Sequence, residues 1–379
     1  MLAAILLVLV AGSLMFCVLA VAAAVRYRAV RPAPLRPPHW ASAPPVSILK
    51  PLSGAEEGLE DNLLSFFEQC YPAFEILFAV RHSQDAAVPI VERLRARYPA
   101  VPSRLIVTGE PPYPNAKVFS LSCMLAAASH RLLVMADSDT RVSPAMLATL
   151  AAEFQDPKLA LATCPYCAVP GPSFWSTLEA LGLNTEFAGG VLVARMLDGM
   201  KFALGPTIAV WRETLDGIGG LEALKDYLAE DYVLGKRVAQ SGARVILSSY
   251  VIEHRIGAQG LAANLRHRLR WNRSTRRSRP WGYAGQLFTH PLPLALLLWA
   301  VQPDWWPVVP LAAIFRAAAG WVTAMYALDD PLTRRLWWLG PIQDIASFLV
   351  WLAGFFGNTI LWRGRTYALL RDGRFELVR

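Results

Sequence analysis

Two carboxylates, Asp137 and Asp139, follow an apolar run in the segment LLVMADSDTRVSP, with one serine between them. Like charges this close repel each other and cost stability unless a positive charge compensates them. Two hard oxygen donors at this spacing can share a divalent cation, which can in turn bridge two phosphate groups. A capping or turn pair is the alternative interpretation of the same residues.

Two further acidic sites could carry chemistry. Glu230 and Asp231, in YLAEDYVLGKRVAQSG, open an amphipathic helix, where the helix dipole alone already favours acids. Asp85, in RHSQDAAVP, follows the apolar segment FEILFAV and could equally be the N-cap of the next helix. Both sites therefore remain candidates that need supporting neighbours.

A basic segment, LRHRLRWNRSTRRSRP, runs from Leu265 to Pro280. Its arginines are too many for an ordinary solvated face, and Trp271 beside Arg270 offers an aromatic surface with a fixed cation. An interfacial helix on anionic lipid and a nucleic-acid patch are the other interpretations. Because apolar segments follow directly, we expect lipid contact and no nucleic-acid partner.

The elements that must position these residues alternate between strands and helices from Val46 onward. This pattern predicts a mostly parallel sheet, in which ligands bind beyond the carboxyl ends of the strands. Asp137 and Asp139 stand at such an end. Neither a G-x-G-x-x-G nor a G-x-x-x-x-G-K-[ST] motif is present, so a diphosphate would be held by a metal instead. The expected strands are 46–51, 74–80, 104–109 and 131–137, and the expected helices are 59–70, 88–99 and 117–129.

Composition indicates a membrane protein, because 54% of the 379 residues are hydrophobic and only 17% are charged. Residues 2–24 carry no charge and are long enough to span a bilayer. A cleaved signal peptide is the alternative, but the segment is too long and no basic residue precedes it. By the positive-inside rule, the arginines that follow place that flank in the cytoplasm: Arg26, Arg28, Arg31 and Arg36.

Three C-terminal segments are also apolar enough to be spans: 287–301, 305–328 and 342–362. The basic tail should be cytoplasmic too, which requires an even number of crossings in this region. We therefore expect one segment to be re-entrant or interfacial, with Arg316, Asp344 and the Gly340-Pro341 break as markers.

The five cysteines are an odd number for a disulfide framework in a cytosol-facing domain. Cys164-Pro-Tyr-Cys167 resembles a redox pair, yet it lies inside the strand-like run LALATCPYCAV rather than at a helix N-terminus. Two packed thiols are the interpretation we favour.

Taken in order, Asp85, Asp137-Ser-Asp139, Glu230-Asp231 and Arg270-Trp271 resemble the D, D, D, (Q/R)-x-x-R-W signature of lipid-directed and processive glycosyltransferases with the GT-A fold. The chain is most similar to the ceramide glucosyltransferases of glycosyltransferase family 21. The segments VSILKPLSG, PNAKVFSL, ADSDTRV, LAEDYVLGKRVA and RHRLRW carry this resemblance. Within the family, RLRWNRSTRRSRP looks most like the bacterial hopanoid-biosynthesis glycosyltransferases. One position departs from the signature: His267 stands where the family has Gln or Arg.

The resemblance implies roles for each motif. Asp137 and Asp139 would hold Mg²⁺ or Mn²⁺ on the diphosphate of a UDP-sugar, and Asp231, next to Glu230, would act as the catalytic base. The residues that would bind the nucleotide-sugar are Asp85, Asn115, Lys117, Asp137, His267, Arg270 and Trp271. For Asn115 and Lys117 the alternative is a plain helix start.

These observations predict an α/β GT-A domain, Rossmann-like with a mostly parallel sheet, between N-terminal and C-terminal transmembrane helices. The expected activity is inverting transfer of N-acetylglucosamine from UDP-GlcNAc to bacteriohopanetetrol at a bacterial inner membrane, with the catalytic domain in the cytoplasm. Transfer of glucose from UDP-glucose to ceramide is the alternative, followed by a processive polysaccharide synthase and a non-catalytic membrane scaffold. The expected regions are an anchor (1–25), a Pro-rich linker (26–45), the GT-A domain (46–260), a basic interfacial helix (261–283), a transmembrane or re-entrant region (284–362) and a basic cytoplasmic tail (363–379).

Overall fold

The computed structural model describes residues 1–29, 43–362 and 364–378. Most of the expected Pro-rich linker, with Arg31 and Arg36, and the tail residues Arg363 and Arg379 therefore lie outside the described residues. The chain forms two compact units. The first comprises Met1–Val30, Cys167–Asp198 and Ile256–Arg379, and the second comprises Arg31–Tyr166 and Gly199–Arg255.

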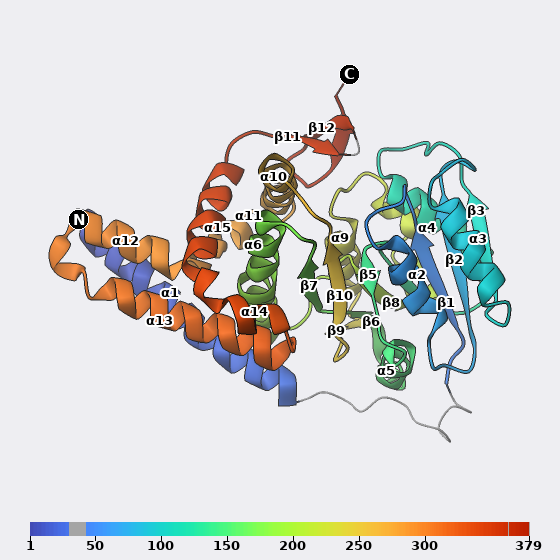
Figure 1. Ribbon diagram of the computed structural model, residues 1–379, viewed down its shortest axis with the longest axis horizontal. Helices are drawn as coiled ribbons and strands as arrows, with labels where there is room; N and C mark the ends of the chain where they lie inside the picture. Colours follow the sequence, from blue (N-terminus) through green and yellow to red (C-terminus); the bar gives the residue numbers. More distant parts are fainter. Residues whose placement is uncertain (30–42, 363, 379) are drawn as a thin grey trace. The chain divides into compact units, whose positions relative to one another are not determined.

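A seven-stranded sheet is the centre of the second unit, with the strand order β3-β2-β1-β4-β8-β6-β9 (Figure 1). Strand β8 is antiparallel to both of its neighbours, whereas the other pairs in the sheet are parallel. The mostly parallel α/β sheet is therefore confirmed. The strands are β1 (Val46–Pro51), β2 (Phe74–Val80), β3 (Ser103–Val107), β4 (Leu132–Ala136), β6 (Leu159–Thr163), β8 (Thr207–Trp211) and β9 (Arg244–Leu247).

The central strands β1, β2 and β4 are buried almost throughout, as expected for strands covered on both faces. Short strands β5 (Thr140–Arg141) and β10 (Ile252–Ile256) pair antiparallel beyond the end of β4. The helices of this unit are α2 (Leu59–Phe67), α3 (Val88–Arg97), α4 (Ala116–Ala127), α5 (Met146–Glu153), α8 (Arg212–Gly217), η3 (Leu221–Leu224) and α9 (Glu230–Gln240). Each strand and helix expected between residues 46 and 137 is present, with ends that differ by three residues at most.

The first unit is helical. Its first part contains α1 (Leu2–Ala29), α6 (Phe174–Gly182), η2 (Leu183–Phe187) and α7 (Ala188–Asp198), after the strand β7 (Tyr166–Pro170). Its second part contains α10 (Leu261–Ser278), α11 (Pro280–Gly285), η4 (Gln286–Thr289), α12 (Pro291–Val301), η5 (Pro303–Trp305), α13 (Val308–Trp321), η6 (Val322–Ala327), α14 (Pro331–Leu336), η7 (Trp337–Leu339) and α15 (Gly340–Gly354). A small antiparallel sheet, β11 (Thr359–Trp362), β12 (Arg365–Leu369) and β13 (Phe375–Leu377), follows.

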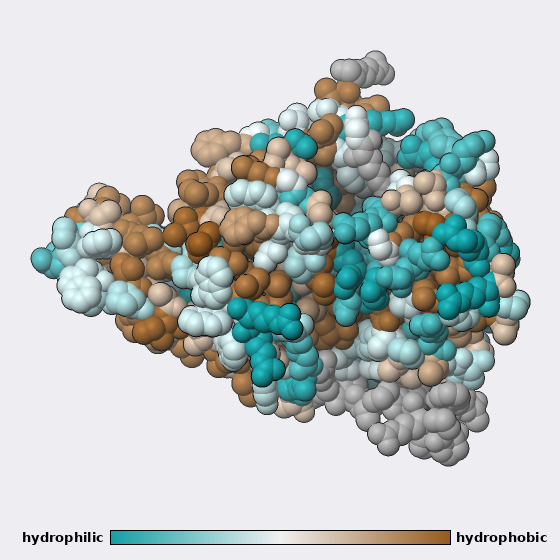
Figure 2. All heavy atoms as spheres, viewed as in Figure 1, coloured by the Kyte–Doolittle hydropathy of each residue, from teal (hydrophilic) through white to brown (hydrophobic). Residues whose placement is uncertain are grey.

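Helices α1, α12 and α13 pack side by side, with Val10, Leu294, Ala295 and Leu298 among the buried side chains between them (Figure 1). Their outer faces stay apolar, since Val8, Leu297 and Ile314 are all exposed. Figure 2 shows hydrophobic residues gathered on the visible face of these helices. Exposed aliphatic side chains on these helices suit a lipid environment, and α1, with 28 residues, is itself long enough to cross a bilayer.

Three described segments are long and apolar enough to cross a membrane: Leu2–Ala29, Pro303–Ala327 and Pro331–Gly354. A fourth, Pro280–Thr289 with Pro291–Val301, is bent by 69° and is either a broken span or a re-entrant loop. The bend thus lies at His290 and not at Gly340-Pro341, where the sequence led us to look. Proline is tolerated in the first turn of a helix, which explains why α15 begins at Gly340-Pro341 without breaking its segment. The expected last span also ends early, because residues 359–362 form β11.

The Cys-Pro-Tyr-Cys segment turns from β6 into β7, and Cys164 is buried. Burial raises the pKa of the Cys164 thiol, which opposes thiolate chemistry. No disulfide forms among the five cysteines, all of which lie in the described part of the chain. These findings favour packed thiols.

Candidate functional site

A salt-bridge cluster at the edge of the large sheet joins three of the residues selected from the sequence. The Lys117 ammonium nitrogen Nζ lies 2.7 Å from Asp137 Oδ1 and 3.1 Å from Glu230 Oε1. Asp137 follows the end of β4, Lys117 lies in the first turn of α4, and Glu230 begins α9. The fold therefore brings together charges that are up to 113 residues apart in the sequence (117 to 230).

Asn115 connects the same helix starts. Its side-chain oxygen caps α4 by accepting from the Val118 amide at 3.1 Å. Its side-chain nitrogen donates to the Tyr227 carbonyl at 2.8 Å and to Glu230 Oε2 at 3.3 Å. Asn115 is thus both the helix cap that the sequence allowed and a tie between α4 and the start of α9.

The loop that carries Asp137 and Asp139 is held from inside the sheet by Lys50, a fully buried residue of β1. Lys50 Nζ donates to the Asp137 carbonyl at 2.5 Å and to Thr140 Oγ1 at 3.2 Å, and it lies 3.8 Å from the centre of the Phe66 ring. Burial lowers the pKa of Lys50 to about 7, although Asp137 and Asp139 oppose this effect. The loop is therefore fixed through its backbone, which leaves both carboxylates for other partners.

Asp139 faces His254 of β10, with 3.4 Å between Oδ1 and the ring nitrogen Nδ1. Burial raises the pKa of Asp139, but the interaction with His254 and the nearby Lys50 outweigh it and lower that pKa overall. Within the described residues, Asp139 Oδ1 is buried and accepts no hydrogen bond. Carboxylate oxygens and an imidazole nitrogen are donors that Mn²⁺ or Mg²⁺ accepts, so the residue types fit the divalent cation that the sequence implies. In the described part of the chain, however, Asp137, Asp139 and His254 do not place their ligand atoms within 4.8 Å of one another, and Asp137 Oδ1 pairs with Lys117.

Asp231 lies next to Glu230 in the first turn of α9. Burial and the neighbouring Glu230 raise the pKa of Asp231 to about 7, while Lys117 opposes the rise. Burial likewise raises the pKa of Asp137, against the effect of Lys117. A carboxylate whose pKa is near neutrality is suited to accept a proton at physiological pH.

Gly205 permits the close approach of Asp231. A Cβ atom at position 205 would lie 2.9 Å from Asp231 Oδ2, closer than real Cβ contacts come. The next residue, Pro206, accepts a hydrogen bond from the Asp137 amide at 3.0 Å. The loop before β8 therefore contacts both the backbone of Asp137 and the side chain of the candidate base, Asp231.

We expect Gly205→Ala to lower turnover about 10-fold or more by pushing Asp231 away, because small displacements of a catalytic group are costly. Gly217→Ala is the matched control, since a Cβ atom there meets nothing within 4 Å. Initial rates of both variants, with thermal unfolding to confirm folding, check this. Equal rates for the two variants would contradict the placement of Asp231.

Asp85 makes different contacts. Its carboxylate accepts hydrogen bonds from the amide of Gly54, at 2.9 and 3.1 Å, and from the amide of Ala87, at 2.9 Å. It therefore ties the loop after β1 to the loop after β2. No described contact joins Asp85 to the Lys117 cluster, and its binding of a nucleoside stays a prediction.

His267, Arg270 and Trp271 lie on α10 in the first unit. His267 Nδ1 is 2.8 Å from Glu179 Oε1, a buried carboxylate that also accepts from Asn264. The ring of Trp271 lies 5.2 Å from the His267 ring. His267, which stands where the family signature has Gln or Arg, thus has Glu179 as its partner within the same unit. The roles of His267, Arg270 and Trp271 in substrate binding stay predictions.

Sequence reasoning missed His254, Lys50 and Gly205. His254 lies in the unremarkable strand sequence IEHRI, and only the pairing of β10 with β5 brings it to Asp139. A glycine before a proline and a lysine in a strand carry no chemical signal of their own. The importance of Gly205 and Lys50 can be recognised only once the fold shows which side chains they contact.

The sheet order and the acidic edge together define a GT-A glycosyltransferase fold. A mannosyltransferase from Pyrobaculum calidifontis, solved in complex with GDP-Man and Mn²⁺, shares this fold with a TM-score of 0.52, covering 93% of this chain and 99% of that chain at 22% identity. The sequence profile of glycosyl transferase family 21 matches residues 5–375, and the chain belongs to this family.

Two curated relatives are ceramide glucosyltransferases of Caenorhabditis elegans. Ceramide glucosyltransferase 3 is 26% identical over 350 residues, which cover 88% of this chain and 74% of the relative. Ceramide glucosyltransferase 1 is 31% identical over 209 residues, which cover 55% of this chain and 44% of the relative. The chain thus matches less than half the length of the second of these relatives.

Proposed function

We propose that this protein is an inverting glycosyltransferase that transfers a sugar from a UDP-sugar to a hydroxyl group of a membrane lipid. The observation that carries the proposal is the cluster at the sheet edge, where Lys117 joins Asp137 to Glu230 beside Asp231. Membership of glycosyl transferase family 21 supports it, and so do the apolar helices of the first unit.

The chemistry needs one base and no enzyme nucleophile. The Asp231 carboxylate accepts the proton of the acceptor hydroxyl while that oxygen forms a bond to the anomeric carbon. The bond from the anomeric carbon to the β-phosphate oxygen breaks, and UDP leaves with the electron pair. A single displacement of this kind inverts the anomeric configuration.

The other residues of the cluster prepare the site. Lys117 supplies a fixed positive charge beside Asp137. Glu230 places a negative charge beside Asp231, which raises the pKa of that carboxyl group. Asp137 and Asp139, with His254, would hold Mg²⁺ or Mn²⁺, which when bound neutralises charge on the diphosphate. Asp85 and Asn115 are proposed to contact the nucleotide. For His267, Arg270 and Trp271 the proposal rests on the family signature alone.

Two acceptors are compatible with this site. Resemblance in the arginine-rich segment favours bacteriohopanetetrol with UDP-GlcNAc, whereas the curated relatives favour ceramide with UDP-glucose. The site chemistry is the same for both, because each lipid presents a hydroxyl group. We place the reaction at the cytoplasmic face of a bacterial inner membrane, since Arg26 and Arg28 flank the end of α1.

A product analysis tests the proposal. Purified protein in detergent, with UDP-GlcNAc or UDP-glucose and either bacteriohopanetetrol or ceramide, should yield one glycolipid whose mass reports both sugar and acceptor. Release of UDP without a glycolipid product, or no reaction with any pair, would oppose lipid transfer. A product that grows by repeated sugar addition would favour a polysaccharide synthase.

Removal of divalent cations should abolish sugar transfer. Without a cation, no positive charge would balance the negative charges of Asp137, Asp139 and the diphosphate. The measurement is the initial rate after EDTA treatment, followed by titration with Mn²⁺ or Mg²⁺. We expect a loss of about 100-fold or more that either ion reverses. Full activity in excess EDTA would rule out the assigned role of this pair.

A further inference from the structure

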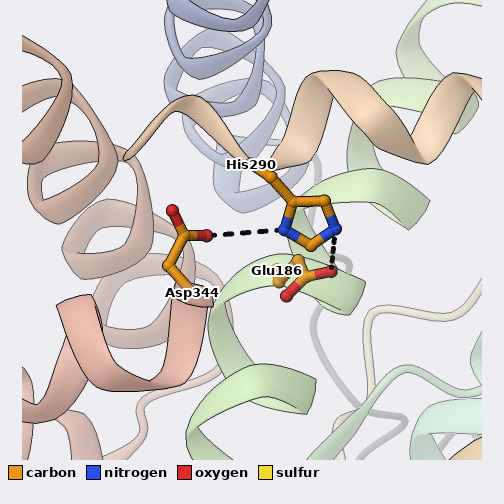
Figure 3. A group of neighbouring side chains, drawn as sticks. All are labelled: Glu186, His290 and Asp344. Atoms are coloured by element: carbon orange, nitrogen blue, oxygen red, sulfur yellow. Dashed lines mark ion pairs between the residues drawn. The ribbon is translucent and has the colours of Figure 1, made fainter. Parts of the chain in front are cut away.

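A second group of side chains that could bind a metal lies inside the first unit, and none of its members has a role in the proposed reaction. Glu186 of η2, His290 at the start of α12 and Asp344 of α15 place one ligand atom each within 4.8 Å of one another. Figure 3 shows the His290 ring between the two carboxylates. Asp344 is fully buried, His290 is 1% exposed and Glu186 is 18% exposed.

His290 is a buried polar side chain without a hydrogen-bond partner. Within the described residues, neither of its ring nitrogens makes a hydrogen bond. Nδ1 lies 3.6 Å from Asp344 Oδ1, and Nε2 lies 3.6 Å from Glu186 Oε1. These separations are too long for N–H···O hydrogen bonds. One ion can bind only one nitrogen of the ring, and one ligand atom from each of the three residues lies within 4.8 Å of the other two. Ligands of a tetrahedral Zn²⁺ lie about 3.4 Å apart when each bond is about 2.1 Å, so the three side chains need to move only slightly closer to share an ion.

Acidic side chains outnumber the arginines around the group. Arg316 of α13 donates from Nε to Asp344 Oδ1 at 3.1 Å, so one guanidinium faces the carboxylates of Asp344 and Glu186. Nearby, Arg268 and Glu179 add one charge of each sign. With His267 and His290 both neutral, one negative charge remains inside an apolar helical unit, where unpaired charge is costly.

Both carboxylates are already oriented by their neighbours. Glu186 accepts hydrogen bonds from Thr289 Oγ1 at 3.3 Å and from Gln343 Nε2 at 3.0 Å. Asp344 accepts from the Leu292 amide at 3.3 Å as well as from Arg316. Hydrogen bonds that fix ligating carboxylates in this way are the usual support of metal ligands in proteins.

We propose that Glu186, His290 and Asp344 bind a structural Zn²⁺ ion that fastens η2, α12 and α15 together. One imidazole and two carboxylates form a ligand set of the type that Zn²⁺ accepts, with further positions open to water. The ion supplies the missing positive charge and gives His290 a partner. A proton on His290 would balance the charge as well, and the zinc measurement below distinguishes a proton from a bound ion.

The experiment measures zinc on the full chain. Protein purified in detergent is incubated with Zn²⁺, passed through a desalting column and analysed by plasma mass spectrometry. We expect about one zinc per chain, and a zinc affinity lowered more than about 100-fold in His290→Gln and in Asp344→Asn, each of which lacks one ligand. His82→Gln, which changes an exposed histidine, is the matched control and should keep its zinc.

Asp139→Asn separates this site from the proposed catalytic one, because it should keep its zinc whatever happens to sugar transfer. If His290→Gln does not fold, Glu186→Gln replaces it in the zinc measurement. The zinc K-edge absorption spectrum of the wild-type protein is then recorded as well, and it should show one imidazole among oxygen ligands. Added Zn²⁺ should raise the Tm of the wild type and not of the ligand variants. Wild-type protein without zinc, or equal zinc in wild type and ligand variants, would overturn the proposal and leave protonation of His290 as the explanation.

Discussion

Asp231→Asn should lower the rate of lipid glycosylation by about 10²- to 10⁴-fold, the contribution that a positioned general base makes. The amide is nearly the same size as the carboxylate, so contacts with the Gly205 loop are kept while the proton acceptor is lost. The measurement is single-turnover glycolipid formation with saturating UDP-sugar. Asp216→Asn, at an exposed position on α8, is the control and should be unaffected.

The pH dependence gives the same prediction a second test. A base works only when it is ionised, and burial together with Glu230 raises the pKa of Asp231 to about 7. Activity should therefore rise with pH and reach half its plateau near pH 7 in kcat/KM, which reports the free enzyme. Glu230→Gln removes a negative neighbour, so it should move this midpoint to lower pH. A midpoint that stays in place in Glu230→Gln, together with a normal rate in Asp231→Asn, would show that another residue is the base.

Much of the sheet could be predicted because its signals are local. The runs VSILKP and FEILFAV have the length and bounds of buried strands, and the structure places β1 and β2 on the same residues. The end of β4 could be predicted for the same reason, since Asp137 interrupts an apolar run. Once the strands are parallel, acids at their carboxyl ends must share an edge.

The partners of those acids could not be predicted, because they depend on contacts between distant segments. Lys117 had a plausible alternative as a helix start, and only the position of α9 gives it a second carboxylate. His254 reaches Asp139 through strand pairing across 115 residues of sequence (139 to 254). The bend at His290 was missed as well, because proline near a helix start does not by itself indicate a change of direction.

Lys117→Met should destabilise the protein by roughly 1–3 kcal/mol at neutral pH, since removing one partner of a partly buried ion pair leaves uncompensated charge that solvent screens only in part. Burial alone would lower the pKa of Lys117, but Asp137 and Glu230 raise it above its usual range, so the ammonium group stays charged. Without it, Asp137, Glu230 and Asp231 face one another with no cation between them. Thermal unfolding in detergent without nucleotide or metal measures the effect, with exposed Lys158→Met as the control.

The sign of the pH dependence distinguishes lost charge from lost packing. Removing Lys117 raises the folded-state pKa values of its carboxyl neighbours further above their unfolded values, because Lys117 lowers the pKa of both Asp137 and Asp231. A carboxyl group with a raised pKa in the folded state stabilises the fold below its unfolded pKa and loses that effect as pH rises through the folded pKa. The stability difference between Lys117→Met and wild type should therefore be small in acid and grow toward neutral pH.

The double variant Lys117→Met/Glu230→Gln completes the argument. Taking away one of the like charges should recover part of the lost stability, so the two substitutions should be non-additive by about 1 kcal/mol or more. The acid limb of the pH–activity profile should respond to the same two charges. Lys117→Met should shift it to higher pH, because Asp231 loses a cation that lowers its pKa. Adding Glu230→Gln should shift it back toward lower pH, because a negative neighbour is then removed as well. A destabilisation that is constant with pH and strictly additive would mean that Lys117 acts through packing alone, and the electrostatic account of the cluster would then be wrong.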